Sequence, residues 1–391
     1  MQSLFLIVAL TTLSLIYYYI GRRLITPLAL KRSRRKILWI LLALVPLLLP
    51  ISFILRFNMN NSILADSFGW LAYILLGFSS ILLVFLFARD IYTLFLSLTQ
   101  KYRSNRAPVT TYDPERRKFL VNSTNLAAIG ASFILTGYGI YEARRQANLE
   151  ELVIPISGLP NEFEGFRIVQ FSDVHVGPTI KRRFVESVVT QVNELNPDLI
   201  ACTGDMVDGS VNDLRDDVSP LGDLVASYGK FFVTGNHEYY VNASPWIAEM
   251  ERLGLTVLLN NHKVIQKSDS KIAVAGVTDF NSSRFIPEHI SDPKAAIAGV
   301  EKDTPKILLA HQPKSIHIAA DAGYDLQISG HTHGGQYIPW SFLVTIAQPY
   351  IEGLHRHKNT WIYVNRGTGY WGPPMRIGVP SEVTLFSLTH A

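Results

Sequence analysis

Three long runs without a charged residue lie near the start of the chain. They cover residues 3–20, 37–55 and 69–88. A helix of about 20 apolar residues crosses the roughly 30 Å hydrocarbon core of a bilayer. Burial inside a soluble domain is the alternative, but three runs that lack a polar face are hard to bury in this way. We therefore predict three membrane-spanning helices, the second of them kinked by Pro46 and Pro50.

A fourth run, residues 119–141, is less apolar and has polar residues in its first turns. We predict that it also spans, which gives a membrane region of about four transmembrane helices over residues 1–145. A linker over 146–160 and a globular domain over 161–391 complete the predicted organisation. The composition agrees with this division, because 48% hydrophobic and 17% charged residues suit a chain that lies partly in lipid.

The charges of the connecting loops predict the orientation. Seven Lys and Arg residues lie between the first and second runs, and seven lie between the third and fourth. Such loops stay in the cytoplasm, so a spanning fourth run puts the globular domain on the extracytoplasmic side of a multi-pass cell membrane protein. If residues 119–141 do not span, that domain is cytoplasmic. Arg116 and Arg117, before Phe119 and Leu120, resemble a twin-arginine export signal, with simple topology charges as the alternative.

Charge is unevenly distributed along the chain. Residues 1–150 hold 17 Lys and Arg against 6 Asp and Glu, whereas the remainder holds 19 against 26. The globular half is therefore acidic, which argues against nucleic-acid binding, because that usually needs a basic surface. The single cysteine, Cys202, excludes an intramolecular disulfide and cysteine-rich zinc modules.

Short apolar segments alternate with helical ones after residue 150, which is typical of an α/β domain with layered sheets. A helix is predicted over 182–195, where apolar residues recur at helical spacing. In such sheets, ligands bind beyond the carboxyl ends of the strands. Strands are predicted at 166–172, 198–205, 230–238, 271–277, 306–311, 324–330, 361–365 and 382–388.

Polar residues form five groups where the predicted strands end. Each residue alone is better explained as a hydrogen-bonded loop residue, but five groups together indicate one shared site. Asp, Asn and His without a thiolate suit manganese (Mn), iron (Fe) or zinc (Zn) better than calcium. The set exceeds what one metal needs, and a carboxylate can bridge two metals, as in two-metal phosphoester hydrolases. The groups are Asp173 and His175, Asp205 and Asp208, Asn236 and His237, His311, and His331 and His333.

The order of these groups, D-x-H, G-D, G-N-H-E, H and G-H-x-H, resembles that of the calcineurin-like metallophosphoesterases over roughly residues 160–391. The stretch GHTHGGQ and the later VNRGTGYWGPPMRIGVPSEVTLF are similar to the membrane-associated bacterial YkuE-type subgroup. The resemblance implies a four-layer α/β/β/α sandwich with a binuclear metal site at its edge. The expected fold is thus an α/β metallophosphoesterase sandwich preceded by an α-helical transmembrane region.

The resemblance also implies roles for the site residues. His237 would face the substrate and stabilise the developing charge or protonate the leaving oxygen. Asp208 would orient His237, with a simple turn residue as the alternative. The first metal would be held by Asp173, His175, Asp205 and His333, and the second by Asp205, Asn236, His311 and His331, so that Asp205 bridges them.

Two further features bear on the substrate. Protein phosphatases of this family follow the second aspartate motif with Arg-Gly, whereas this chain has GDMVDGS. That difference weakens a protein-phosphatase function and leaves room for diesters or a lipid-linked phosphate. In the apolar segment 334–354, the side chains of Trp340, Phe342, Leu343 and Tyr350 either pack in the core or form an apolar lip that admits lipid-like substrates or touches the bilayer.

The sequence thus predicts a membrane-anchored phosphoric ester hydrolase with two divalent ions, Mn, Fe or Zn. A metal-bridging hydroxide would attack a phosphomonoester, phosphodiester or pyrophosphate bond in a lipid-linked or nucleotide-linked substrate. The expected partners are the lipid bilayer and this small-molecule or lipid-like substrate, with no nucleic acid; the oligomeric state is not predicted. One alternative is a transporter or sensor with a regulatory phosphoesterase domain, although the first three runs lack mid-span ionisable residues. The other is a metal-binding scaffold without turnover, against which the complete ligand set argues.

Overall fold

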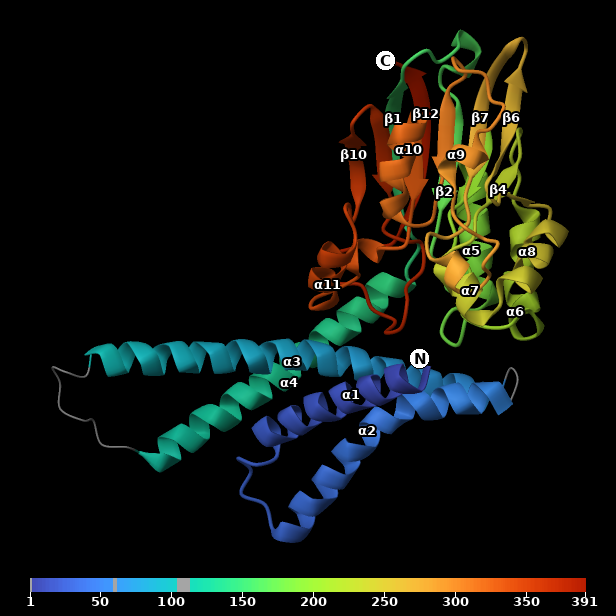
Figure 1. Cartoon of the computed structure of the whole chain (residues 1–391). Helices are drawn as coiled ribbons and strands as arrows, with labels where there is room; N and C mark the ends of the chain where they lie inside the picture. Colours follow the sequence, from blue (N-terminus) through green and yellow to red (C-terminus); the bar gives the residue numbers. More distant parts are fainter. Residues whose placement is uncertain (1, 59–61, 104–112) are drawn as a thin grey trace. The chain divides into compact units, whose positions relative to one another are not determined.

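The computed structural model describes residues 2–58, 62–103 and 113–391. The chain divides into two compact units, Met1–Ile140 and Tyr141–Ala391 (Figure 1). Each unit has its own secondary structure: helices alone form the first, and two sheets with flanking helices form the second.

The first unit contains long helices at the predicted apolar runs. Among the described residues, three helices are long and apolar enough to cross a membrane, over Arg32–Ser52, Ile63–Thr99 and Pro114–Arg144. They match the predicted runs 37–55, 69–88 and 119–141. The helices are α1 (Gln2–Leu24), α2 (Arg32–Asn58), α3 (Ile63–Arg103) and α4 (Pro114–Arg144).

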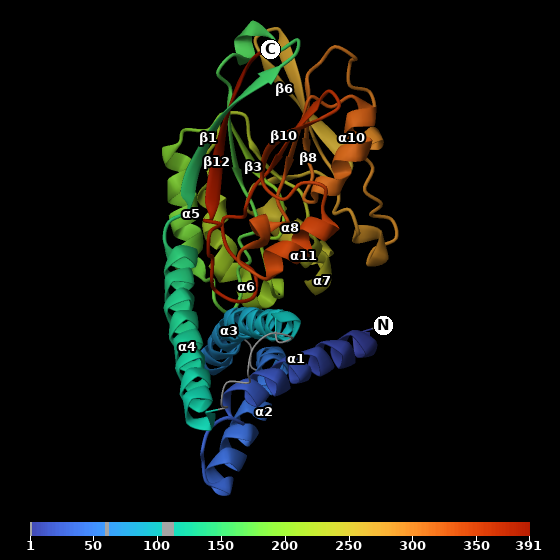
Figure 2. The same ribbon diagram turned by 90° about the vertical axis from the view of Figure 1, so that its left-hand side faces the viewer.

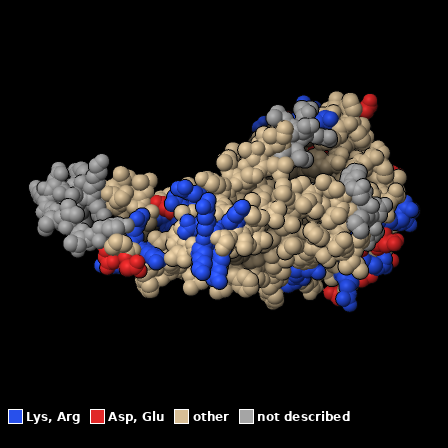
Figure 3. Space-filling view, turned by 90° about the horizontal axis from the view of Figure 1, so that it is seen from below, with Lys and Arg blue, Asp and Glu red and all other residues tan. Residues whose placement is uncertain are grey.

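The first predicted run, residues 3–20, forms α1, but the side chains of its first residues lie outside the described part of the chain. A membrane span there stays a prediction. Large apolar side chains such as Ile37, Phe87 and Phe133 are exposed along α2, α3 and α4. The face shown in Figure 3 is correspondingly formed mainly by uncharged residues, with Lys and Arg gathered in small parts of it. These features are those of a membrane protein.

The second unit contains two six-stranded sheets. In the first sheet, β1 runs parallel to β12, and β2, β3, β4 and β5 are parallel to one another. In the second sheet, β7, β8, β9 and β11 are parallel, with β6 and β10 antiparallel at the two edges. The first sheet has the order β1 (Asn148–Ile156), β12 (Glu382–His390), β2 (Arg167–Phe171), β3 (Leu199–Cys202), β4 (Lys230–Phe232) and β5 (Thr256–Val257). The second has the order β10 (Gly353–His357), β11 (Thr360–Val364), β9 (Leu326–Ser329), β8 (Lys306–Leu309), β7 (Ser270–Gly276) and β6 (Asn261–Lys267).

Helices cover the outer face of each sheet, which gives four layers. Along β2, Ile168 belongs to the apolar cluster between the sheets, whereas Val169 and Phe171 belong to the cluster beneath the outer helices. This alternation follows from the two-residue period of a strand. Figure 2 shows α5 and α10 on opposite sides of the sheets. The α/β/β/α prediction is therefore confirmed. The helices are α5 (Arg182–Glu194), α6 (Val211–Val218), α7 (Asn236–Val241) and α8 (Ala243–Arg252) beside the first sheet, and α9 (Pro293–Ala296), α10 (Ile316–Ala322) and α11 (Trp340–Ala347) in the later part of the chain.

Residues 148–156 of the expected linker form strand β1, which corrects that part of the predicted organisation. The strand pairs with β12 along its whole length, and Ile154 and Ile156 are buried between the sheets. Its apolar residues near the end provide that burial, so this segment belongs to the sandwich. The other domain limits stay predictions.

The last turn of α4 belongs to the second unit, because the unit boundary falls between Ile140 and Tyr141. Ala143 is buried in the core of that unit. Arg144 donates a hydrogen bond of 2.7 Å from Nη1 to the carbonyl oxygen of Thr179. Strand β1 begins only four residues later, at Asn148, so the helix leads directly into the sandwich.

Candidate metal centre

All nine predicted site residues follow the ends of parallel strands. Residues 173–175 follow β2, residues 205–208 follow β3, and Asn236 and His237 follow β4 and begin α7. His311 follows β8, and residues 331–333 follow β9. Because parallel strands end at one edge of a sheet, the chain brings these side chains together.

One group of buried side chains consists of Asp173, His175 and His333. The Nε2 atoms of the two histidines lie 3.0 Å apart. Nε2 of His333 lies 3.4 Å from Oδ1 of Asp173, and Nε2 of His175 lies 3.9 Å from Oδ2 of Asp205. Three buried residues and one atom of Asp205 thus face a common point.

A second group consists of Asp205, His311 and His331. Nε2 of His311 lies 3.1 Å from Oδ2 of Asp205 and 3.2 Å from Oδ1 of Asn236. Nδ1 of His331 lies 3.2 Å from the same His311 nitrogen. The Oδ2 atom of Asp205 therefore borders both groups.

The chemistry of these two groups fits two divalent cations. Burial lowers the pKa of His331 to about 3, and burial together with His175 holds the pKa of His333 well below its usual range. Neutral imidazoles and carboxylates are the ligands that such cations accept in proteins. Ring nitrogens of different histidines also face one another at hydrogen-bond distance, and a shared cation would satisfy their lone pairs. These residues could hold the metals that the sequence predicts.

The backbone of the candidate ligands is strained. Asp173, His175, Asp205, His331 and His333 all have positive φ angles, between 51° and 75°. Residues other than glycine rarely adopt this left-handed region, and each such residue costs about 1–3 kcal/mol. Strain of this kind is concentrated at functional sites, where the surrounding structure holds it.

Glycines let the two aspartates be approached closely. A Cβ atom on Gly330 would lie 2.3 Å from Oδ2 of Asp173, and one on Gly235 would lie 2.1 Å from Oδ1 of Asp205. Both distances are far below van der Waals contact. The glycines of the G-N-H-E and G-H-x-H motifs are therefore required by the packing around the carboxylates.

Asp208 connects the first group to His237. Its Oδ1 atom lies 2.6 Å from Nδ1 of His237 and 3.1 Å from Nδ1 of His175. Although burial raises the pKa of Asp208, the two histidines hold it well below its usual range. With Nδ1 donating to Asp208, His175 turns the lone pair of Nε2 toward the first group. Asp208 is thus more than a turn residue, since it contacts both rings.

His237 is the candidate residue best placed to meet a substrate. Its side chain is 13% exposed, and its Nε2 atom lies 4.0 Å from Oδ2 of Asp205. Burial opposes its ionisation, but the carboxylates of Asp205 and Asp208 outweigh that effect and raise its pKa to about 9. The ring is therefore protonated at neutral pH, with the proton on Nε2 available to a bound molecule.

Two supporting residues were missed from the sequence. The buried carboxylate of Glu238 accepts hydrogen bonds from the backbone N–H groups of Asp205, Met206 and Gly235. The fully buried guanidinium of Arg376 donates to the carbonyl oxygens of Arg366 and Gly369, beside His333. The available signals were an acidic residue in the G-N-H-E motif, for Glu238, and an arginine inside an apolar stretch, for Arg376. Neither signal indicates which groups the side chain would contact.

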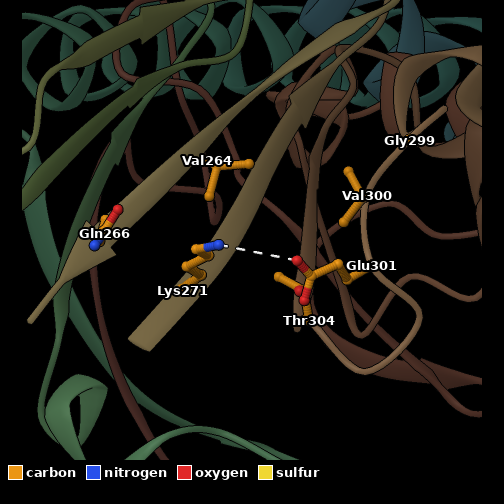
Figure 4. Close-up of a pocket in the computed structure, with 7 residues that line it drawn as sticks. All are labelled: Val264, Gln266, Lys271, Gly299, Val300, Glu301 and Thr304. Carbon is orange, nitrogen blue, oxygen red and sulfur yellow. Dashed lines mark ion pairs between the residues drawn. The ribbon is translucent and has the colours of Figure 1, made fainter. Parts of the chain in front are cut away.

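Among the described residues, a pocket of about 320 Å³ lies away from this centre (Figure 4). It borders β6 and β7, and a 3.9 Å ion pair joins Lys271 to Glu301 at its side. None of the nine candidate residues lines it. The residues that do are Val264, Gln266, Lys271, Gly299, Val300, Glu301 and Thr304.

Comparison with known proteins gives four findings. Residues 166–335 match the family described as calcineurin-like phosphoesterase. The chain is 35% identical over 329 residues to a transmembrane protein with metallophosphoesterase domain from Danio rerio, covering 82% of this chain and 74% of that protein. It is 34% identical over 284 residues to the uncharacterized metallophosphoesterase YkuE of Bacillus subtilis, covering 70% of this chain and 97% of that protein. A putative 5'-nucleotidase structure from Staphylococcus aureus aligns with a TM-score of 0.36 and 14% identity, over 58% of this chain and 54% of that chain.

Proposed function

Because this chain belongs to the calcineurin-like metallophosphoesterases, we propose that it is a membrane-anchored hydrolase of phosphoric esters with two divalent metal ions. The observation that carries the proposal is the position of Oδ2 of Asp205, which borders both groups of candidate ligands. A carboxylate shared in this way is what a two-metal site needs. A transporter or sensor is not favoured, because the family is one of phosphoesterases and the side chains at the site are of the kinds that phosphoester hydrolysis uses.

The ligands of the two cations divide as the resemblance implies. When bound, two divalent cations would neutralise phosphate oxygens and lower the pKa of a water molecule. The donor set suits Mn, Fe or Zn. Asp173, His175, Asp205 and His333 would hold the first ion, and Asp205, Asn236, His311 and His331 would hold the second.

His237 acts as the general acid in this proposal. The 2.6 Å contact with Asp208 fixes the ring through Nδ1, so Nε2 is the ring atom left to carry the transferred proton. As the oxygen of a water molecule forms a bond to phosphorus, that water releases one proton to solvent. The bond to the leaving oxygen breaks, His237 donates its proton to that oxygen, and the ring regains a proton from solvent. Asp208 keeps the ring in the tautomer and orientation that this transfer needs.

The substrate is a small phosphoester, lipid-linked or nucleotide-linked. The sequence GDMVDGS lacks the Arg-Gly of the protein phosphatases, which favours a small molecule over a phosphoprotein. The acidic charge of residues 151–391 supports a partner other than nucleic acid. The basic loops between the first and second runs and between the third and fourth runs support a catalytic unit on the extracytoplasmic side.

The test is the His237→Ala variant of the full chain, assayed with bis(p-nitrophenyl) phosphate and Mn²⁺. We expect kcat to fall by about 100- to 10,000-fold, because the leaving oxygen loses its proton donor. Metal content, measured by mass spectrometry, should stay unchanged, since His237 is not among the ligands. Wild-type protein treated with EDTA supplies the metal-free reference and should be inactive until Mn²⁺ is restored.

His390→Ala is the matched control, because that histidine lies at the exposed end of β12 and its side chain is paired with Glu164. It should keep wild-type turnover. Unchanged turnover of His237→Ala would remove His237 from the mechanism, and activity that survives EDTA would contradict the metal requirement.

A further inference from the structure

Helix α11 has an apolar surface over which none of the described residues packs. The helix follows the candidate ligand His333 by seven residues, and residues 334–351 contain no charged side chain. Phe342 is 64% exposed, Leu343 57% and Ile346 85%. No side chain of α11 is buried. Positions 342, 343 and 346 lie on one side of a helix, so they form a continuous apolar face.

Contacts next to the candidate ligands hold α11 at both ends. At its beginning, Nε1 of Trp340 donates to the hydroxyl of Tyr337 over 3.1 Å. At its end, the side-chain amide of Gln348 donates over 3.4 Å to that of Gln312, the neighbour of His311. The helix is therefore a fixed part of the wall around the candidate centre.

The same wall continues to His237. The side chain of Gln336, just before α11, bonds the backbone N–H and carbonyl groups of Trp371. The exposed Trp371 ring contacts His237 with centroids 5.6 Å apart, and the exposed Tyr240 ring contacts His237 at 5.0 Å. Two exposed aromatic rings thus flank His237, and Gln336 connects one of them to the segment that leads into α11.

The occupant of this face follows from the chain itself. The candidate span Pro114–Arg144 ends inside the sandwich unit, where Ala143 is buried and Arg144 is bonded to Thr179. The bilayer is thus an apolar phase to which the candidate span ties the sandwich covalently. An uncharged helix that begins with Trp suits the boundary between headgroups and acyl chains.

We propose that α11 docks on the lipid bilayer, with Phe342, Leu343 and Ile346 inserted among the acyl chains. This surface gives the bilayer a defined contact on the sandwich. Docking of α11 would also bring His237 to the phosphate groups of membrane lipids, a consequence that rests on the proposed function.

The experiment places a fluorescent label on α11 in the full chain, reconstituted in phosphatidylcholine vesicles. Ile346→Cys carries nitrobenzoxadiazole, and doxyl-labelled phosphatidylcholine is the quencher. Val225→Cys is the matched control, since this aliphatic side chain is 68% exposed and its segment lies at the other end of the strands, where Tyr228 N–H donates to Asp198 O. Cys202 is fully buried, so the labelled parent chain measures its background.

We expect quenching at 346 to exceed that at 225 by at least about twofold, with a blue-shifted emission, because an interfacial helix lies about 5–10 Å into the bilayer boundary. Leu343→Cys, on the same face, repeats the measurement if the first variant fails to fold. Equal quenching at 346 and 225 would overturn the proposal. A shift that appears only at high protein-to-lipid ratio would also overturn it, by assigning the face to a second copy. Neither readout depends on hydrolysis, so this result is separate from the proposed activity.

Discussion

Five of the candidate metal ligands have a strained backbone conformation. Asp173, Asp205 and three of the histidines have positive φ angles, a conformation that their side chains disfavour. The motifs predicted which residues meet at the site, because strand ends converge. They could not predict the strained backbone, which depends on packing by glycines from distant strands.

Gly330 is one of those glycines, and its replacement gives a prediction at this scale. In Gly330→Ala, the new Cβ would lie 2.1 Å from Oγ of Ser172 and 2.3 Å from Oδ2 of Asp173. We expect the free energy of unfolding to fall by about 1–3 kcal/mol from overpacking. Metal content should fall as well, because Asp173 must move. Urea denaturation and mass spectrometry measure the two effects.

Gly222→Ala is the comparison for that variant. A Cβ at Gly222 would have its nearest neighbour at 3.5 Å, the Cδ2 atom of Leu253, which is an ordinary contact. Its stability and metal content should match those of the wild type. Equal behaviour of the two variants would show that close packing at Gly330 is unimportant.

At the scale of elements, helix α7 and the loop after β3 are joined by one carboxylate. Both oxygens of Glu238 are used: Oε2 accepts from the N–H groups of Asp205 and Gly235, and Oε1 accepts from Met206. Burial and the charge of Asp205 raise the pKa of Glu238 to about 7. These three hydrogen bonds explain the place of Glu238 in the G-N-H-E motif, because they position Asp205, the carboxylate that borders both groups.

The Glu238→Gln variant tests the role of these hydrogen bonds. Glutamine has one acceptor oxygen, and its amide group would face an N–H donor, so at least one buried backbone donor is left unpaired. We expect the free energy of unfolding to fall by about 1–3 kcal/mol, together with weaker metal binding at Asp205. Calorimetric titration of the metal-free protein with Mn²⁺ measures the binding. Glu251→Gln, at an exposed position of α8, should change neither quantity, and an unaltered Glu238→Gln would contradict the role.

The elements themselves were only partly predictable. The eight predicted strands match β2, β3, β4, β7, β8, β9, β11 and β12, because short apolar segments between turns read as buried strands. Strands β5, β6 and β10 were not predicted. Strand β5 has only two residues, and the sequences of β6 (NHKVIQK) and β10 (GLHRH) are mostly polar. For 334–354 the sequence left core packing and an apolar lip open. Trp340, Phe342 and Leu343 are exposed, which excludes core packing for these three side chains. Tyr350 instead packs against a buried cluster that includes Ile316 and Ile362. The apolar pattern alone could not separate the two cases, because exposure depends on tertiary structure.

At the scale of the whole molecule, the described chain combines candidate membrane helices with a two-sheet sandwich. Length and the lack of charge made α2, α3 and α4 predictable. The start of the sandwich was harder to predict, because exposed residues alternate along β1 and no turn residues before it mark the beginning of a domain. The side on which the sandwich lies depends on whether residues 119–141 cross the membrane.

Reporter fusions test that orientation. Alkaline phosphatase fused after Ala391 should be active and green fluorescent protein should be dark there, because the basic loops hold the other side in the cytoplasm. Fusions after Lys31, between the first two runs, should give the reverse result. A fluorescent and phosphatase-inactive fusion at Ala391 would place the sandwich in the cytoplasm and exclude a span at 119–141.

The end of α4 inside the sandwich has a kinetic consequence. On the proposed function, a catalytic unit that is covalently joined to a membrane span would meet lipid-linked substrates by lateral diffusion. The encounter rate would then follow the number of substrate molecules per unit area of membrane. Dilution of the aqueous phase would leave that rate unchanged, whereas spreading the same substrate over more lipid would slow it.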